Sequence, residues 1–117
     1  MGKNGLTSSH RANLTERSIV VTGGAGFLGS FVVQQLRAAG CVNVVVPRSK
    51  DYDLVQLEAV HELLVDTRPD LIIHLAARVG GIGINREQPG TFFYENLMMG
   101  AQLMEAARLH GVDKFVS

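Results

Sequence analysis

The sequence predicts an α/β fold, a doubly wound parallel sheet, and three observations support this prediction. Short runs rich in Val and Ile alternate along the chain with segments in which apolar residues recur every three or four positions. No hairpin signal joins neighbouring runs, which favours parallel pairing through right-handed helical crossovers. The length of 117 residues, with 46% hydrophobic side chains, is enough for one domain with a packed core.

The first expected unit is a strand, a glycine turn and a helix. Structure is predicted to begin at Ser18, and residues 19–21 form a continuous β-branched run typical of a strand covered on both faces. A helix is predicted over residues 27–39, where apolar side chains recur at spacings of three and four. Gly40 follows at the position where a helix is commonly capped in the left-handed conformation.

The same pattern is predicted twice more along the chain. Residues 42–46 are expected to form a second buried strand, and the carboxylate of Asp53 is expected to cap the next helix. The apolar residues at helical spacing in that helix are Leu54, Leu57, Val60, Leu63 and Leu64. Arg68-Pro69 is predicted to end this helix, and residues 70–75 are predicted to form a third strand.

The C-terminal part is expected to hold a glycine-rich loop, a long helix and the opening of a fourth strand. The loop covers residues 78–83, and the helix runs from about residue 89 to residue 110. Gly111 is expected to end this helix, and residues 114–117 to open the fourth strand.

The domain boundaries follow from the same periodicity. Residues 1–17 are polar and lack a periodic pattern, so they are expected to form a flexible N-terminal tail. Residues 18–117 then form a single domain. Because a domain seldom terminates within a strand at an uncovered sheet edge, the chain is expected to be a fragment.

Charge and cysteine content exclude several classes of function. Eleven basic and eleven acidic residues give a net charge of zero, which provides no long-range positive field for nucleic acid or an anionic membrane. The N-terminus lacks the apolar core of a signal peptide, and no stretch of about eighteen apolar residues occurs. The lone Cys41 cannot form an internal disulfide bond, which favours a reducing, cytoplasmic location.

A glycine motif between the first strand and the first helix indicates a phosphate site. Gly23, Gly26 and Gly29 are spaced three and three. In a Rossmann-type sheet the first such glycine permits a tight turn, the second lets the backbone approach a pyrophosphate, and the third lets helix and strand pack closely. The pyrophosphate then binds the free N–H groups at the helix N-terminus. A flexible turn is the alternative interpretation.

The end of the second strand indicates which dinucleotide binds. NAD-binding domains commonly place a carboxylate there for the ribose hydroxyls, whereas basic residues accommodate the 2′-phosphate of NADP. The tip consists of Pro47, Arg48, Ser49 and Lys50, with Asp51 only behind them. These residues favour NADP, and the alternative is that Arg48 and Lys50 are ordinary solvated charges.

The motifs together resemble the extended short-chain dehydrogenase/reductase family, whose members handle nucleotide sugars. The resemblance covers residue 19 to the end of the chain and includes the glycine motif after Thr22 and the segment His74-Leu75-Ala76-Ala77. Within that family, the stretch Ala76-Ala77-Arg78-Val79-Gly80-Gly81-Ile82 and the later Asn85 and Phe93-Tyr94-Glu95-Asn96-Leu97-Met98 resemble the GDP-L-fucose synthases. Those enzymes epimerise and reduce GDP-4-keto-6-deoxy-mannose with NADPH.

The resemblance implies a set of cofactor contacts along the chain. The residues implied for the pyrophosphate are Gly23, Gly24, Ala25, Gly26, Phe27, Leu28 and Gly29. Arg48, with Lys50 as a further candidate, is implied for the adenosine phosphate, and Asp53 and Leu54 for the adenine edge. Leu75, Ala76 and Ala77 are implied for the middle of the cofactor.

The catalytic motif of that family is missing from the sequence. The family uses Tyr-x-x-x-Lys, but Tyr52 is followed four residues later by Gln56, and Tyr94 by Met98. Ser117 precedes the position of the family's catalytic Ser or Thr and is given a structural role. No catalytic residue and no metal ligand are therefore assigned.

The expected function is the NADP-binding part of a nucleotide-sugar epimerase/reductase with a GDP-sugar substrate. Another NAD-dependent nucleotide-sugar epimerase or dehydratase is one alternative, and a non-catalytic dinucleotide-binding fragment is another. The particular sugar and the oligomeric state stay open, with a homodimer as one option.

Several polar and sulfur-containing side chains have competing interpretations. His74 is expected to be a structural imidazole bonded to the backbone, and Arg78 either meets a ligand or is solvated. Asn96 either supports active-site loops or contacts solvent. The helix-surface residues His61 and His110 are expected to be solvated. The expected core methionines are Met98, Met99 and Met104.

Overall fold

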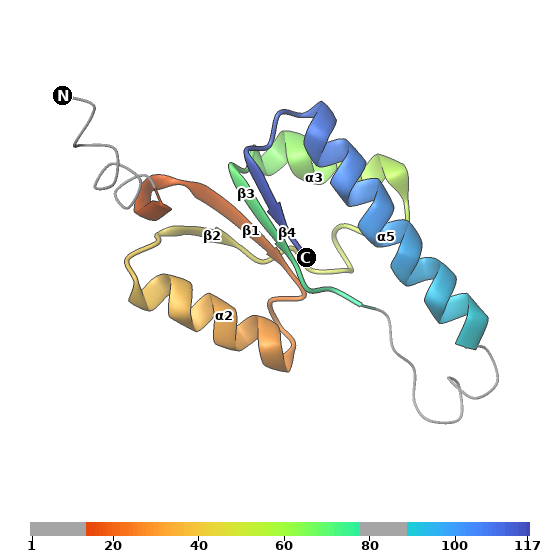
Figure 1. Cartoon of the computed structure of the whole chain (residues 1–117), viewed down its shortest axis with the longest axis horizontal. Coiled ribbons are helices and arrows are strands. Elements are labelled where there is room, and N and C mark those ends of the chain that lie inside the picture. The colour runs from red at the N-terminus through yellow and green to blue at the C-terminus, as the bar shows by residue number, and fades with distance from the viewer. Residues whose placement is uncertain (1–13, 78–88) are drawn as a thin grey trace.

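A four-stranded parallel sheet forms the centre of the protein. The computed structural model describes residues 14–77 and 89–117 (Figure 1). The strands are β1 (Ser18–Thr22), β2 (Asn43–Val45), β3 (Leu71–His74) and β4 (Lys114–Val116). Their order across the sheet is β2-β1-β3-β4, and every neighbouring pair is parallel. The predicted parallel sheet is therefore confirmed.

Helices cover both faces of this sheet. They are α2 (Phe27–Ala38), α3 (Leu57–Thr67) and α5 (Pro89–Leu109). In Figure 1, α2 lies on one side of the sheet, and α3 and α5 lie together on the other. This arrangement confirms the expected α/β class with its doubly wound sheet.

The alternation of side chains along the strands divides the core into two layers. Ile19 and Val21 of β1 pack with Val33 and Cys41 on the α2 side. The intervening Val20 faces the other layer, which also contains buried residues of α3 and α5. The layer on the α3 and α5 side comprises Val20, Leu54, Val60, Leu63, Leu64, Ile72, Met99, Leu103, Ala106 and Ala107. Because successive side chains of a strand point to opposite faces, a continuous apolar run fills both layers.

The second strand differs from the sequence prediction. The run 42–46 was expected to be buried, but β2 shows an exposed–intermediate–exposed pattern, and Val42 is 80% exposed. Within the described residues β2 pairs with β1 and lies at the end of the strand order, so its outer side is open. Val44 and Val46 still pack against the α2 layer. The Val-rich run thus predicted the strand correctly but not its burial.

The start of α3 also differs from the prediction, because its N-cap is Gln56 and not Asp53. Asp53 instead organises a turn before the helix. Its Oδ1 atom accepts the N–H of Val55 at 3.2 Å, and its carbonyl accepts the N–H of Gln56 at 2.9 Å. An Asp side chain commonly accepts a backbone N–H two residues on in such turns. The predicted helix end is confirmed, since Arg68 is the C-cap in the left-handed conformation with φ of 44°.

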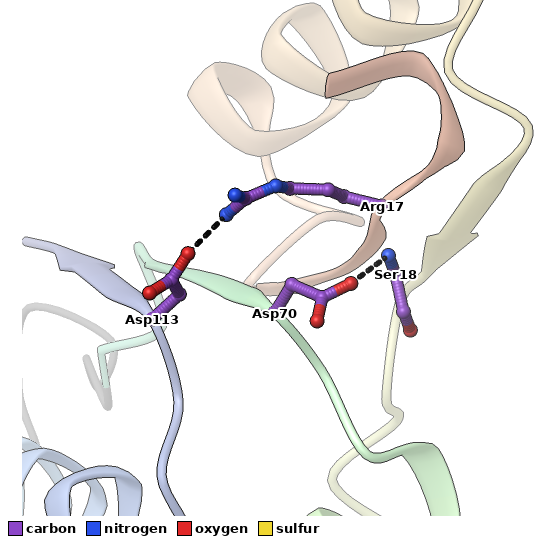
Figure 2. A network of polar contacts seen from close by, with 4 residues as sticks. All are labelled: Arg17, Ser18, Asp70 and Asp113. Carbon is purple, nitrogen blue, oxygen red and sulfur yellow. Dashed lines mark hydrogen bonds and ion pairs between the residues drawn. The ribbon is translucent and has the colours of Figure 1, made fainter. Parts of the chain in front are cut away.

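Polar contacts tie together the amino ends of three strands (Figure 2). The N–H of Ser18 donates to Asp70 Oδ2 at 2.9 Å, and the N–H of Asp70 donates to the Ser18 carbonyl at 2.8 Å. Arg17 pairs with Asp113 at 2.7 Å, just before β4. The expected tail covered residues 1–17, and Arg17 in its described part is thus in contact with the domain. Residues 1–13 lie outside the described residues.

Side chains on and beside α3 and α5 differ from two expectations of the sequence analysis. Met99 is buried, as expected, but Met104 is 54% exposed because it lies on the outer side of α5. His61 is half-buried and His110 is exposed, and the two are not merely solvated, because Nδ1 of His61 lies 2.9 Å from Nε2 of His110. Among the described residues, no helix is long and apolar enough to cross a membrane.

Candidate functional site

A cavity of about 490 Å³ opens at the carboxyl ends of β1, β2 and β3. Ligands of open α/β sheets bind at this edge. Its lining comprises Thr22, Gly23, Gly24, Ala25 and Gly26 after β1; Pro47, Arg48, Ser49, Tyr52, Asp53 and Leu54 after β2; Leu75, Ala76 and Ala77 after β3; and Met99 of α5. Three segments that are distant in sequence therefore share one concave surface.

Most of the expected cofactor contacts lie in this lining. They are Gly23, Gly24, Ala25, Gly26, Arg48, Asp53, Leu54, Leu75, Ala76 and Ala77. Phe27, Leu28, Gly29 and Lys50 are not among the lining residues. The Phe27 side chain is 96% exposed, and Gly29 lies buried behind the turn. The expected glycine-rich loop 78–83, with Arg78, falls outside the described residues.

The glycine turn packs directly on the segment after β3. Gly23 has a φ of +75°, a conformation that glycine adopts readily, and its carbonyl accepts the N–H of Gly26 at 3.0 Å. A Cβ atom at Gly23 would lie 2.7 Å from the backbone nitrogen of Ala76. A Cβ atom at Gly29 would overlap the carbonyl oxygen of Gly23. The turn and the start of α2 therefore approach each other more closely than other residues would allow.

Gly26 has a different environment. It is the N-cap of α2, with φ of −78° and ψ of 178°, and no side chain caps this helix end. A Cβ atom there would meet only the Gly23 carbonyl oxygen, at 3.4 Å. The first N–H groups of a helix have no partners within the helix and carry its positive dipole end. This uncapped N-terminus adjoins the cavity and is suited to a phosphate group.

The wall after β2 is held by a turn at Arg48 and by a hydrogen bond to α3. The Arg48 carbonyl accepts the N–H groups of Asp51 and Tyr52 at 2.9 and 3.0 Å, which makes the tip a turn. The Tyr52 hydroxyl donates to Asp66 of α3 at 2.7 Å. This hydrogen bond, with burial, raises the pKa of Tyr52 above its ordinary value.

Gln102 of α5 holds the next part of that wall. Its Nε2 donates to the carbonyl oxygens of Leu54 and Val55 at 3.1 and 2.9 Å. These carbonyls lie before α3, where no helix or sheet supplies a regular partner. Gln102 therefore ties the expected adenine side of the cavity to α5.

The wall after β3 is held by Thr22 of β1. The Thr22 Oγ1 atom accepts the N–H groups of Leu75 and Ala76 at 3.0 and 3.2 Å, and it lies 2.7 Å from Nδ1 of His74. Burial lowers the pKa of His74 below its ordinary value of 6.5. His74 was expected from the sequence to bond the backbone, but its partner is the side-chain hydroxyl of Thr22.

Several lining residues were not assigned to the site from the sequence. They are Thr22, Pro47, Ser49, Tyr52 and Met99. Thr22 could have been found from its place directly before the glycine turn, and Pro47 and Ser49 from their place in the strand tip. Met99 reaches the cavity through tertiary packing of α5, which leaves no local signal. Asn96 is half-buried on α5 and is absent from the lining.

Metal binding gains no support from the arrangement of side chains. Within residues 14–77 and 89–117, no group of three or more His, Cys, Asp or Glu residues is placed to hold an ion.

Comparison with known proteins identifies the family. The model of the NAD dependent epimerase/dehydratase family matches residues 19–117. The chain belongs to this family. Its members' dinucleotide chemistry is consistent with the position of the cavity at the carboxyl edge of the sheet.

Individual members of the epimerase/dehydratase family resemble the chain over most of its length. The GDP-L-fucose synthase of Sinorhizobium fredii is 36% identical over 103 residues, which cover 88% of this chain and 32% of that enzyme. A GDP-L-fucose synthetase from Naegleria fowleri bound to NADP has a TM-score of 0.73 and 30% identity, over 88% of this chain and 30% of that structure. The UDP-glucose 4-epimerase of Thermus thermophilus, in complex with NAD, has a TM-score of 0.68 and 33% identity, over 84% of this chain and 36% of that structure. The chain spans about a third of the length of the curated relatives it matches.

Proposed function

We propose that this chain is the NADP-binding part of a nucleotide-sugar epimerase/reductase of the GDP-L-fucose synthase type. The cavity is the observation that carries the proposal, because it joins the glycine turn, the strand tip with Arg48 and the segment after β3. Its volume of about 490 Å³ is within the range of small-molecule sites. The similarity to the S. fredii enzyme and to the NADP-bound N. fowleri structure supports the same assignment.

The pyrophosphate is assigned to the glycine turn and the start of α2. The uncapped N-terminus of α2 adjoins the cavity at Gly26, where the protein itself leaves room for a Cβ atom. Glycine at this position is therefore explained by the close approach of a ligand and not by packing within the protein. The backbone N–H groups of the first turn would donate to the phosphate oxygens.

The 2′-phosphate is assigned to Arg48 and Ser49. Both line the cavity directly after β2, whereas Lys50 does not. A guanidinium group and a hydroxyl suit a phosphate, and Pro47 at the strand tip offers no carboxylate to the ribose. Asp53 and Leu54 are proposed at the adenine, and Leu75, Ala76 and Ala77 at the middle of the cofactor.

These assignments define the role of the chain's residues in the chemistry of the site. NADPH, when bound, supplies a hydride, and the residues of this chain bind and orient it. The substrate is proposed to be a GDP-sugar, as the names of the S. fredii and N. fowleri proteins indicate for those enzymes. A cytoplasmic location belongs to the same proposal and is supported by the lone, buried thiol of Cys41.

A second candidate is an NAD-binding nucleotide-sugar epimerase. Asp53 favours it, because this carboxylate lies in the cavity lining after β2 and could bind ribose hydroxyls. The similarity to the NAD-bound T. thermophilus epimerase is consistent with that candidate. One Asp53 oxygen already accepts the N–H of Val55, which leaves the carboxylate less available to a ribose.

Calorimetric titration of the chain with NADP⁺ and NAD⁺ tests the proposal. A charge-assisted contact to the 2′-phosphate is worth about 1.5–3 kcal/mol, so NADP⁺ should bind at least about tenfold more tightly. Arg48→Ala should remove this preference while leaving NAD⁺ affinity unchanged. Lys50→Ala removes an equal charge from the same tip outside the cavity lining and should change the preference much less.

The outcomes separate the candidates. Equal affinities for the two dinucleotides, or an unchanged preference in Arg48→Ala, would contradict the NADP assignment. A preference for NAD⁺ that is lost in Asp53→Asn would support the second candidate. A folded chain that binds neither dinucleotide would contradict both.

A further inference from the structure

The hydroxyl of Thr22 lies at the junction of β1, β3 and the cavity. Thr22 is the last residue of β1 and is only 1% exposed. Its Oγ1 atom lies 3.0 Å from the Leu75 nitrogen, 3.2 Å from the Ala76 nitrogen and 2.7 Å from His74 Nδ1. One buried oxygen therefore contacts three consecutive residues at the end of β3.

The donors and acceptors at this oxygen fix the direction of each hydrogen bond. A threonine hydroxyl has two acceptor lone pairs and one proton to donate. The N–H groups of Leu75 and Ala76 can only donate, and the Leu75 N–H is shared with the Thr22 carbonyl oxygen, which it also meets at 3.0 Å. Neither N–H can accept the hydroxyl proton, so among the described contacts of Thr22 Oγ1 the acceptor is His74 Nδ1. This assignment makes His74 a neutral ring with its proton on Nε2.

The surroundings of His74 agree with a neutral ring. The ring lies beside Phe115 of β4, with 6.2 Å between the ring centroids, and its Nε2 edge faces Gly100 of α5. Neither neighbour is charged, and the facing residue of β1 is Thr22. Burial is the cause of the lowered pKa of His74, and no charged group of the described residues contributes to it.

The contacts of Thr22 determine where the wall after β3 lies. Leu75 and Ala76 line the cavity, and their backbone is so close to Gly23 that a Cβ atom there would lie 2.7 Å from the Ala76 nitrogen. A change in the Thr22 contacts would move this wall relative to the glycine turn. The two surfaces assigned to the pyrophosphate and to the middle of the cofactor would then no longer fit the same ligand.

We propose that Thr22 and His74 are a positioning pair, in which a hydroxyl proton donated to His74 Nδ1 holds the Leu75–Ala76 wall against the glycine turn in the geometry that binds the dinucleotide. This inference rests on the proposed function. It adds two residues that act on the cofactor through the backbone of Leu75 and Ala76. It also gives cofactor binding a dependence on the protonation of His74.

Substitutions that keep or remove single hydrogen bonds test the pair. Thr22→Val keeps the shape but removes the hydroxyl and should weaken NADP⁺ binding about tenfold, whereas Thr22→Ser should bind within about twofold of the parent. His74→Asn places an amide oxygen near the former Nδ1 position and should also retain binding, whereas His74→Ala should not. His61→Asn is the matched control, because His61 is a half-buried histidine of α3 that lies outside the cavity lining.

The pH dependence of the dissociation constant gives a readout that a purely structural role would not affect. Protonated His74 carries a proton on Nδ1 and cannot accept the Thr22 hydroxyl. Because burial lowers the pKa of His74, the parent should keep full affinity above pH 6.5 and lose it as the pH falls further. His74→Asn should lack this loss, and His61→Asn should retain it. The 2′-phosphate also titrates near pH 6, but its effect is common to all three proteins.

Imidazole nitrogen NMR of the ligand-free chain tests the hydrogen-bond direction separately. The expected result is a neutral His74 ring with an unprotonated Nδ1, and a changed Nδ1 resonance in Thr22→Val. A proton on Nδ1 at neutral pH would overturn the proposal. Equal NADP⁺ affinities for Thr22→Val, Thr22→Ser and the parent would overturn the positioning role alone. A folded parent that binds no dinucleotide would overturn the proposed function and this role with it.

Discussion

Two glycines of the same turn, Gly26 and Gly29, are constrained by different partners. At Gly29 a Cβ atom would overlap the Gly23 carbonyl oxygen, so the protein itself excludes a side chain. At Gly26 the backbone conformation suits any residue, and a Cβ atom would make one contact of 3.4 Å. Packing within the protein thus explains Gly29, whereas the proposed pyrophosphate contact would explain Gly26.

Gly26→Val should abolish dinucleotide binding without unfolding the chain. The added side chain would occupy the space where the backbone meets the pyrophosphate, while replacing glycine at an N-cap costs only about 1 kcal/mol of stability. Calorimetry with NADP⁺ and circular dichroism on the same sample separate the two effects. Parent-like affinity in Gly26→Val would mean that the glycine motif is only a turn.

Gly29→Ala should lower the free energy of unfolding by about 1–3 kcal/mol, because the backbone of the turn must shift to admit the methyl group. Gly90→Ala is a matched control, since Gly90 also lies near the start of a helix but has no atom within 4 Å of its Cβ position. Replacing a helical glycine by alanine in open space should be stabilising. Urea denaturation measures both variants, and equal effects of the two would contradict this account.

At the scale of the elements, Asp70 joins the amino ends of three strands (Figure 2). Its carboxylate accepts the N–H of Ser18, and its carbonyl accepts the N–H groups of Asp113 and Lys114, each at 3.1 Å. The Asp70 side chain thus gives the first N–H of β1 an acceptor, while the Asp70 backbone aligns β3 with β4. Asp70 therefore helps to set the register of the sheet that positions the cavity.

Asp70→Ala should destabilise the chain by about 0.5–1.5 kcal/mol, because the Ser18 N–H loses its acceptor. Asp70→Asn keeps an acceptor oxygen and should remain close to the parent. Arg17→Ala, which breaks a partly exposed ion pair, should cost no more than about 1 kcal/mol. Denaturant titrations rank the three variants. A loss in Asp70→Asn as large as in Asp70→Ala would assign the effect to charge.

The sequence predicted the elements wherever the signal is local. Strand β1, the glycine turn and α2 follow from adjacent residues, and Arg68-Pro69 located the end of α3. The exposure of β2 could not be predicted, because a Val-rich run has the same pattern in a central strand and an edge strand. The helix start at Leu57 was missed because Asp53 satisfies a turn as well as it would satisfy an N-cap.

In the site, too, residues with a local sequence signal were predicted, and contacts that depend on tertiary packing were missed. The glycine turn and Arg48 were predicted because their positions after β1 and β2 are defined by the chain itself. The Gln102 contacts to Leu54 and Val55 were not, because they join residues 47 or more positions apart. The hydrogen bond between His61 and His110 depends on the packing of α3 against α5 in the same way.

At the scale of the whole molecule, this chain should bind a cofactor but should not turn over a nucleotide sugar. Its sequence has no Tyr-x-x-x-Lys, the motif in which a lysine lowers the pKa of a tyrosine that donates a proton. Losing this acid catalysis should reduce the rate by on the order of 10² or more. NADPH oxidation in the presence of GDP-4-keto-6-deoxy-mannose measures this. Steady turnover by the pure chain would reveal a catalytic set not recognised in its sequence.

The central claim is that the cavity at the carboxyl edge of the sheet is the dinucleotide site. The most direct test is a titration of the ¹⁵N-labelled chain with NADP⁺, followed by amide NMR. The largest shifts should fall in the glycine turn, in residues 47–54 and in residues 75–77, which together line the cavity. Saturable binding whose largest shifts fall instead around Arg68 and His110, which line a separate cavity of about 360 Å³, would contradict the claim.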